Sequence, residues 1–129
     1  MNLPAAAPAP HLPYPAPIDA YGAGGFRFAG VSHRGSLLCL PDGIWAWPVA
    51  DPQAVTAETL AVVFAAAARL DLFILGTGRE PWSLPPGLRE SLRAHALKWE
   101  AMPTSAAIRT YNVLLAEGRR VAAGLIAAG

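Results

Sequence analysis

The stretch Arg109-Thr-Tyr-Asn-Val-Leu-Leu-Ala-Glu-Gly-Arg-Arg-Val121 decides the fold of this chain. Its apolar residues recur at helical spacing as far as Gly118, and the apolar run 120–126 follows at once. A glycine directly after a helix is typical of the left-handed C′ position, so we expect the helix to end there. The stretch therefore predicts a helix that passes directly into a buried strand.

The same alternation repeats upstream of this stretch. Helical patterns at 60–70 and 85–95 alternate with short apolar strands at 71–75 and 97–102, and a third helix is expected to be capped by Thr104 or Ser105. Helices of roughly 10–14 residues between short strands imply right-handed crossovers and a parallel sheet. The second half of the chain therefore predicts an α/β layered domain.

The residues before the first helix have a strand pattern. Three segments, 26–30, 36–40 and 43–49, are separated by turn signals at His33-Arg-Gly35 and Pro41-Asp-Gly43. This spacing predicts an antiparallel β meander as an N-terminal extension of the sheet. Residues 1–17 alternate proline with alanine and carry no charged side chain, which predicts a flexible tail before a single domain at 18–129.

Composition excludes several classes of protein. The chain has 129 residues, of which 53% are hydrophobic, and its formal net charge is +1, so it has no basic surplus for non-specific nucleic acid binding. Its single cysteine, Cys39, excludes an intrachain disulfide and is expected to be a buried, inert thiol. No apolar run is long enough to span a bilayer and no secretory signal is recognisable, which predicts a cytoplasmic protein without stable membrane insertion.

The loop Gly76-Thr77-Gly78 is the first candidate binding site. It follows a predicted parallel strand, and ligands of open α/β sheets bind outside the carboxyl ends of the strands. Its two glycines allow close backbone approach, so free amides there could hold an anion. The alternative is a plain strand-to-loop turn, because neither a dinucleotide fingerprint nor a P-loop is present.

The third helix supplies the second candidate group. Ser105, Arg109 and Asn112 lie at i, i+4 and i+7 and therefore share one helical face, which we expect to open on the same edge as the glycine loop. A guanidinium beside helix amides suits a carboxylate or a phosphate. The alternative is that Arg109 pairs with a structural carboxylate or carbonyl group.

A catalytic constellation is not recognisable in this sequence. His33 is expected to be a solvated turn residue, and no carboxylate pair or Ser-His-Asp set has a motif context. We therefore predict no catalytic residue, no metal site and no cofactor, and the sequence favours a non-enzymatic protein without excluding an enzyme.

Several segments together resemble a known family. The segments 18–22, 25–30, 33–36, 75–78, 100–104 and 109–119 are similar, in this order, to the Mth938-like family, which includes mitochondrial proteins resembling complex I assembly factor 3. The resemblance implies a three-layer α/β fold with a central mixed sheet, which the right-handed crossovers predict to be mostly parallel. It also implies that the mitochondrial members act through protein partners. The family pattern has a cysteine where this chain has Ile108, so no thiol can act at that position.

Two functional hypotheses follow. The first is an assembly or protein-interaction factor with an unidentified protein partner, for which a homodimer is left open. The second is a small-molecule or anion-binding protein that uses the crevice formed by Gly76, Thr77, Gly78, Ser105, Arg109 and Asn112.

Overall fold

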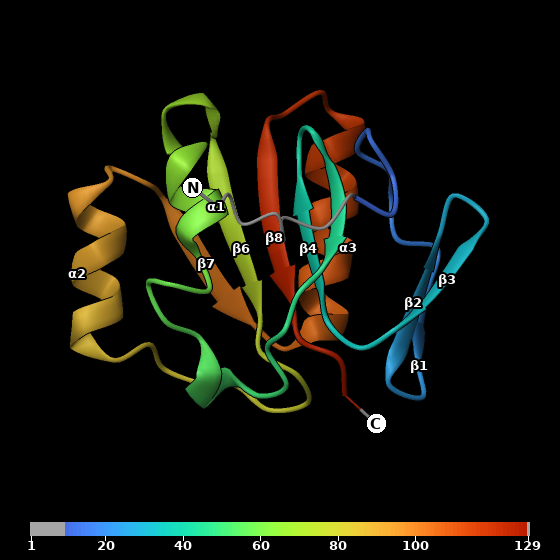
Figure 1. The fold of residues 1–129 in the computed structure, drawn as a ribbon, viewed down its shortest axis with the longest axis horizontal. Helices are drawn as coiled ribbons and strands as arrows, with labels where there is room; N and C mark the ends of the chain where they lie inside the picture. Colours follow the sequence, from blue (N-terminus) through green and yellow to red (C-terminus); the bar gives the residue numbers. More distant parts are fainter. Residues whose placement is uncertain (1–9, 129) are drawn as a thin grey trace, which may run out of the picture.

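A computed structural model describes residues 10–128 of the chain as two sheets with three α-helices (Figure 1). The strands are β1 (Ala20–Gly22), β2 (Gly25–Phe28), β3 (Val31–Arg34), β4 (Leu37–Leu40), β5 (Gly43–Ala46), β6 (Leu72–Gly76), β7 (Trp99–Met102) and β8 (Val121–Leu125). The helices are α1 (Ala61–Ala65), α2 (Pro86–Ala94) and α3 (Thr104–Ala116), with short 3₁₀ helices η1 (Pro52–Ala54) and η2 (Ala67–Arg69).

The central sheet has five strands in the order β5-β4-β8-β6-β7. Strand β6 pairs in parallel with both β7 and β8, whereas β4 pairs in antiparallel orientation with β5 and β8. The parallel part arises because α2 and α3 carry the chain across the sheet between β6, β7 and β8, as the helix spacing predicts. The expected α/β fold with a central mixed sheet is confirmed.

Both faces of the central sheet are covered, which explains why its strands are nearly continuous apolar runs. One face carries Phe73 and Leu75 and packs against side chains from α1 and α2, together with the loops between them. The other face carries Ile74 and Leu125 and packs against α3 and against the small sheet. Alternate residues of β6 therefore enter different core clusters, as the period of a strand requires.

The antiparallel extension differs from the predicted meander. Strands β4 and β5 join the central sheet, but β2 belongs to a separate antiparallel sheet of order β1-β2-β3. His33 and Arg34 lie in β3 and do not form the predicted turn. The turn lies instead at Ala29 and Gly30, whose φ angles of 49° and 77° are the left-handed values that a tight hairpin requires.

The first predicted helix, at 60–70, is shorter in the structure than the sequence pattern suggests. The segment predicted as a helix at 60–70 forms only α1, which has five residues, followed by the 3₁₀ turn η2. Alanines dominate this segment and give it no single strong apolar face, so tertiary packing sets the helix length.

The segment before Ile18 packs on the domain from residue 10 onward, so the prediction of a flexible tail is wrong for residues 10–17. Leu12 is buried and forms an antiparallel bridge with Ile44 of β5. Ala16 is buried as well, and its carbonyl accepts a hydrogen bond of 3.1 Å from the Tyr111 hydroxyl. The first nine residues of the predicted tail lie outside the described residues.

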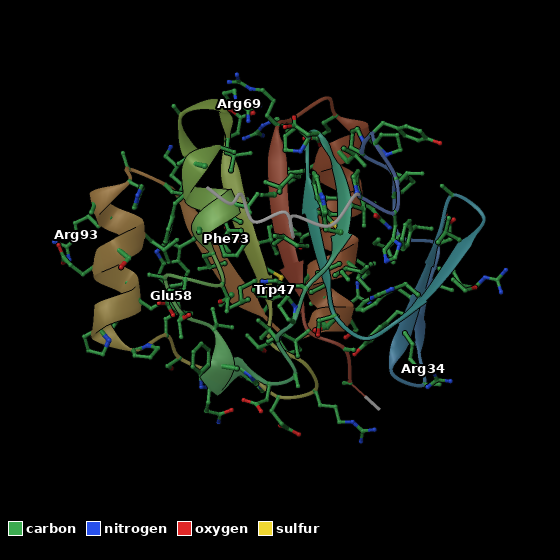
Figure 2. The ribbon with its side chains drawn as sticks, in the orientation of Figure 1. Arg34, Trp47, Glu58, Arg69, Phe73 and Arg93 are labelled. Atoms are coloured by element: carbon green, nitrogen blue, oxygen red, sulfur yellow. The ribbon has the colours of Figure 1, made fainter. Side chains whose placement is uncertain are left out.

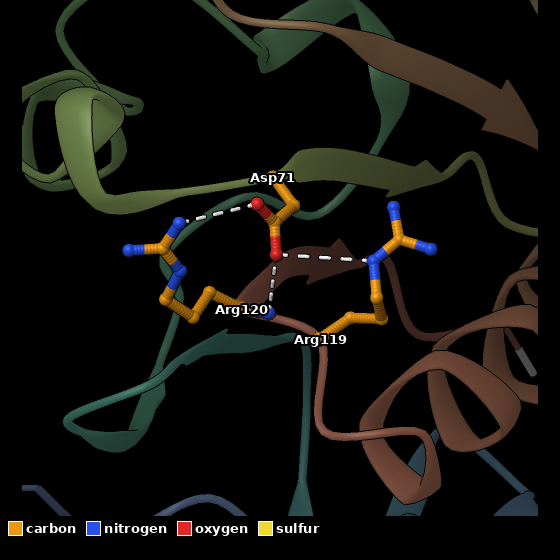
Figure 3. Close-up of polar contacts among 3 residues, drawn as sticks. All are labelled: Asp71, Arg119 and Arg120. Atoms are coloured by element: carbon orange, nitrogen blue, oxygen red, sulfur yellow. Dashed lines mark hydrogen bonds and ion pairs between the residues drawn. The ribbon is translucent and has the colours of Figure 1, made fainter.

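An ion-pair cluster lies at the amino ends of the parallel strands β6 and β8 (Figure 3). The Asp71 carboxylate, next to β6, accepts hydrogen bonds from the Arg120 main-chain N–H at 2.9 Å and from its guanidinium at 3.3 Å. Arg119 lies 3.8 Å from the same carboxylate. The Arg120 N–H, assisted by both guanidiniums, holds the pKa of Asp71 below its ordinary value. The cluster joins the start of β8 to the start of β6.

Helix α3 ends as predicted at Gly118, whose φ is +79°. The Arg119 N–H donates back to the Leu114 carbonyl, and the Gly118 N–H donates to Leu115. These bonds form a Schellman-type end that needs a left-handed C′ residue.

Replacing Gly118 with alanine is expected to lower the free energy of unfolding by about 1–2 kcal/mol, because an L residue is strained at this φ. A Cβ there meets no atom within 4 Å, so the cost is conformational and not steric. Gly87→Ala inside α2 is the matched control and should raise stability by about 0.5–1 kcal/mol. Urea denaturation of both variants makes the comparison, and equal changes would contradict the assigned helix end.

Candidate functional site

The carboxyl ends of β6 and β8 meet the start of α3 at Thr104, which is fully buried. Its hydroxyl accepts a hydrogen bond of 2.8 Å from the Gly78 N–H and donates one of 2.8 Å to the Ile126 carbonyl. Its own N–H donates to the Gly78 carbonyl at 2.9 Å. One threonine therefore ties the ends of two strands to the first turn of a helix.

The glycine loop is packed closely against this threonine. A Cβ on Gly76 would lie 3.0 Å from the Thr104 hydroxyl and 3.2 Å from the Ala107 Cβ, so the glycine permits close packing of α3 on β6. The Thr77 N–H donates to the main-chain carbonyl of Met102 at 2.9 Å, and the Thr77 hydroxyl donates to the main-chain carbonyl of Glu80 at 2.6 Å. The amides of Thr77 and Gly78 are thus already bonded within the protein, and the expected free amides are not present.

Asn112 points away from this edge and binds the N-terminal segment. Its side-chain oxygen accepts a hydrogen bond of 2.9 Å from the Ile18 N–H, and its side-chain nitrogen donates one of 2.9 Å to the Ile18 carbonyl. Both polar functions of the amide are therefore used to hold one residue that is distant in sequence. The structure assigns Asn112 a structural role.

Ser105 and Arg109 share the exposed face of α3, as their spacing predicts. The arginine makes no ion pair with any residue in the described part of the chain. A cavity of about 430 Å³ lies beside Thr77 and Gly78, but neither Ser105 nor Arg109 lines it. The structure therefore does not bring the two halves of the predicted crevice together in this cavity.

The larger cavity, of about 520 Å³, lies elsewhere, on the small sheet. Arg27 and Arg34 line it together with Gly22, Gly25 and Ser32. Sequence reasoning missed this surface, although the alternation Phe26-Arg27-Phe28 places the arginine opposite to two buried rings.

His33 lies on the opposite face of this sheet. Its ring is half-buried and lies 4.6 Å from the His11 ring, measured between centroids. Burial, together with His11, lowers the pKa of His33, so the side chain is neutral at pH 7.

Cys39 is fully buried in β4, as the sequence predicts. Burial raises the pKa of Cys39 to about 12, so almost no thiolate forms near neutral pH. We expect a thiol reagent at pH 8 to label the native protein far more slowly than the protein unfolded in guanidinium chloride. Equal labelling rates, followed by absorbance, would contradict the burial of this thiol.

The comparison with protein families shows which family this chain belongs to. The model of the family described as "Protein of unknown function (DUF498/DUF598)" matches residues 18–126. The chain belongs to this family.

Two relatives are similar to most of this DUF498/DUF598 chain. An uncharacterised protein of Rhodobacter capsulatus is 44% identical over 110 residues, which cover 85% of this chain and 83% of that protein. NADH dehydrogenase [ubiquinone] 1 alpha subcomplex assembly factor 3 of mouse is 30% identical over 109 residues, which cover 84% of this chain. This chain spans 59% of the length of the mouse protein.

Solved structures agree with the fold. A protein of Bartonella henselae, described as an outer membrane protein, is 46% identical with a TM-score of 0.88, and the match covers 92% of this chain and all of that one. A Bordetella pertussis protein, described as a Mth938-like domain, is 33% identical with a TM-score of 0.73, covering 86% of this chain and 85% of that one. The resemblance to the Mth938-like family is confirmed.

Two kinds of feature are absent from residues 10–128 of this DUF498/DUF598 chain. No group of three or more His, Cys, Asp or Glu side chains there could hold a metal ion. No helix there is both long and apolar enough to cross a membrane.

The predicted N-cap of α3, Thr104 or Ser105, is wrong, because the cap of this DUF498/DUF598 helix is Pro103. A threonine before a helical pattern indicates an N-cap, but Thr104 is the first residue of α3 and lies inside its first turn. Its hydroxyl bonds to residues 26 and 22 positions away instead. The proline at position 103, which occupies the cap, was the local signal for this shift.

Proposed function

We propose that this chain is a non-enzymatic assembly or protein-interaction factor for respiratory complex I. The observation that carries this proposal is the 30% identity to assembly factor 3 of mouse, spread over 84% of this chain. The shared part is therefore almost the whole described domain and not a short motif.

The geometry of the carboxyl edge supports an interaction protein over an enzyme. Enzymes with open α/β sheets bind their substrates at this edge through free backbone amides and polar side chains. Here Thr104 occupies the Gly78 N–H and the Ile126 carbonyl, and Thr77 is bonded through both its N–H and its hydroxyl. The polar groups of this edge hold the fold together and leave the exposed surface to bind partners.

Deletion of the gene in its native cell tests the proposal. We expect the amount of assembled NADH dehydrogenase, measured on native gels and by NADH:quinone activity in membranes, to fall, while succinate dehydrogenase stays unchanged. Expression of the intact chain from a plasmid should restore it. A deletion strain with a normal level of assembled complex I would contradict the proposal. The cytoplasmic location and the oligomeric state stay predictions.

Anion binding on α3 is the second candidate function, favoured by the exposure of Arg109 without an ion pair in the described residues. Arg109→Ala should change the free energy of unfolding by less than about 0.5 kcal/mol, because the side chain is exposed. If this candidate is correct, the resonances of residues 104–109 should shift on titration with inorganic phosphate in the wild type and not in the variant. Identical spectra with and without phosphate would remove Arg109 from the candidate site.

A further inference from the structure

The small sheet has one face buried in the domain and one face open. Phe26 and Phe28 of β2 are buried in the core, so Arg27 between them points to the opposite side. Directly paired residues of antiparallel strands lie on the same side of a sheet. The register therefore places six residues on the open side, named here the small-sheet outer face: Ala20, Gly22, Gly25, Arg27, Ser32 and Arg34.

Two arginines dominate the charge of this face. Arg34 is paired with Gly25, and Arg27 lies two residues further along β2, so the two are diagonal neighbours. The backbone positions of diagonal neighbours on one sheet face are about 7–8 Å apart. The two arginine side chains therefore start close together, and their like charges repel in the free protein. Figure 2 shows Arg34 extending from the edge of the small sheet into solvent.

No carboxylate of the described residues neutralises this pair. The ion pairs of the described chain involve Arg69, Arg93, Arg119 and Arg120. Arg34 makes a single long bond of 3.4 Å to the Ala23 carbonyl. Asp19 donates its main-chain N–H to the Arg27 carbonyl at 2.7 Å, but its carboxylate forms no ion pair with Arg27. A negatively charged group from outside would therefore relieve the repulsion between the two arginines.

The floor between the arginines is made of small residues. Ala20, Gly22 and Gly25 have little or no side chain, and Ser32 adds one hydroxyl. The resulting cavity of about 520 Å³ falls within the roughly 300–1,000 Å³ range of ligand-binding clefts. Because these small side chains leave the backbone of the sheet accessible, an extended peptide can lie against it. The Arg27 and Arg34 side chains, at diagonal positions, can then contact that peptide.

We propose that the small-sheet outer face binds an acidic, extended segment of a partner protein, with Arg27 and Arg34 each taking a carboxylate. This inference rests on the proposed function, for which it supplies the interaction surface. A guanidinium binds a carboxylate through two parallel N–H donors, which gives the site both strength and geometric selectivity.

Charge favours this occupant over other macromolecules. A second copy of the chain, docked by the same face, would bring four arginines together without a compensating acid. Nucleic acid binding needs a wide basic surface, whereas the chain has a net charge of only +1 and this face holds two cations. A short acidic segment suits two arginines whose positions on the sheet are about 7–8 Å apart.

The experiment is an NMR titration of the ¹⁵N-labelled full chain with a blocked triglutamate peptide. We expect the main-chain resonances of residues 20–34 to shift, and the Nε–H signals of Arg27 and Arg34 to shift with them. The variant R27Q/R34Q should weaken binding at least about tenfold, since two charge-assisted contacts are lost. A triglutamine peptide should leave the spectrum unchanged, and inorganic phosphate separates general anion binding from binding of an acidic chain.

Two variants keep the test interpretable. R89Q/R93Q removes two exposed arginines from α2, which lies at the opposite end of the molecule from the small sheet (Figure 1), and should bind the peptide like the wild type. Ser32→Glu keeps both arginines but places a carboxylate opposite Arg27, so it should also block binding. All variants should give the well-dispersed spectrum of a folded protein.

Three outcomes would overturn the inference: no shift in residues 20–34, equal loss of binding in R89Q/R93Q, or phosphate binding as tight as peptide binding. The proposed function fails separately, through the deletion strain. If the deletion leaves complex I intact but the peptide still binds, the surface stands without that function. If the intact chain and R27Q/R34Q both restore complex I in the deletion strain, the function stands without this surface.

Discussion

Replacing Thr104 with valine is expected to lower the free energy of unfolding by about 2–6 kcal/mol. The substitution keeps the shape of the side chain but removes the hydroxyl that accepts from the Gly78 N–H and donates to the Ile126 carbonyl. Both partners are buried beside a fully buried residue, and each unsatisfied group costs about 1–3 kcal/mol. The loss should appear as a lower denaturant midpoint with an unchanged slope.

Ser105→Ala is the control for this substitution, because Ser105 is the next residue of α3 and is exposed. Its removal should change stability by less than about 0.5 kcal/mol. If Thr104→Val is as stable as Ser105→Ala, then the threonine does not hold the strand ends together. The carboxyl edge would then have polar groups free to bind a ligand.

Deleting residues 1–17 is expected to destabilise the protein by about 3–5 kcal/mol. The deletion exposes the surface that Leu12 buries, which is worth about 2–3 kcal/mol, and it removes the bridge to Ile44. It also removes the Ala16 carbonyl that binds the buried Tyr111 hydroxyl, a bond worth about 1 kcal/mol. The thermal midpoint of the shortened chain should fall accordingly.

A shorter deletion separates these contacts from the rest of the segment. Removing residues 1–9 takes away none of the contacts made by Leu12 and Ala16, so its thermal midpoint should match that of the full chain. The variant Leu12→Ala should fall between the two deletions. If the 1–17 deletion melts at the same temperature as the full chain, then residues 10–17 contribute nothing to stability and behave as the flexible tail that the sequence predicts.

Local patterns predicted the fold from β6 onward because the signals there are strong and short-range. The helix end at Gly118 needs a left-handed φ that glycine supplies, and the apolar runs of β6 and β8 are buried on both faces. The first half gave weaker signals. Strand β3 reads Val-Ser-His-Arg and has no apolar run, and the hairpin before it has an alanine at a positive φ where glycine or asparagine is the usual signal.

The candidate site was harder to predict because its contacts are long-range. Helical spacing predicted Arg109 and Asn112 on one face of α3, but it could not show that the Asn112 side chain bonds to Ile18, 94 positions earlier. A proline-rich composition likewise shows only that a segment cannot form a helix interior or a central strand. It carries no signal that Leu12 is buried against the domain. Polar residues on a helix face are equally suited to holding the chain itself and to holding a ligand.

Affinity purification of the tagged chain from its native cell tests the central claim most directly, with quantification of NADH dehydrogenase subunits in three matched samples. The account predicts that these subunits accompany the wild type and R89Q/R93Q, and that R27Q/R34Q loses most of them while remaining folded. Absence of complex I subunits from the wild-type sample, or their equal recovery with R27Q/R34Q, would contradict it.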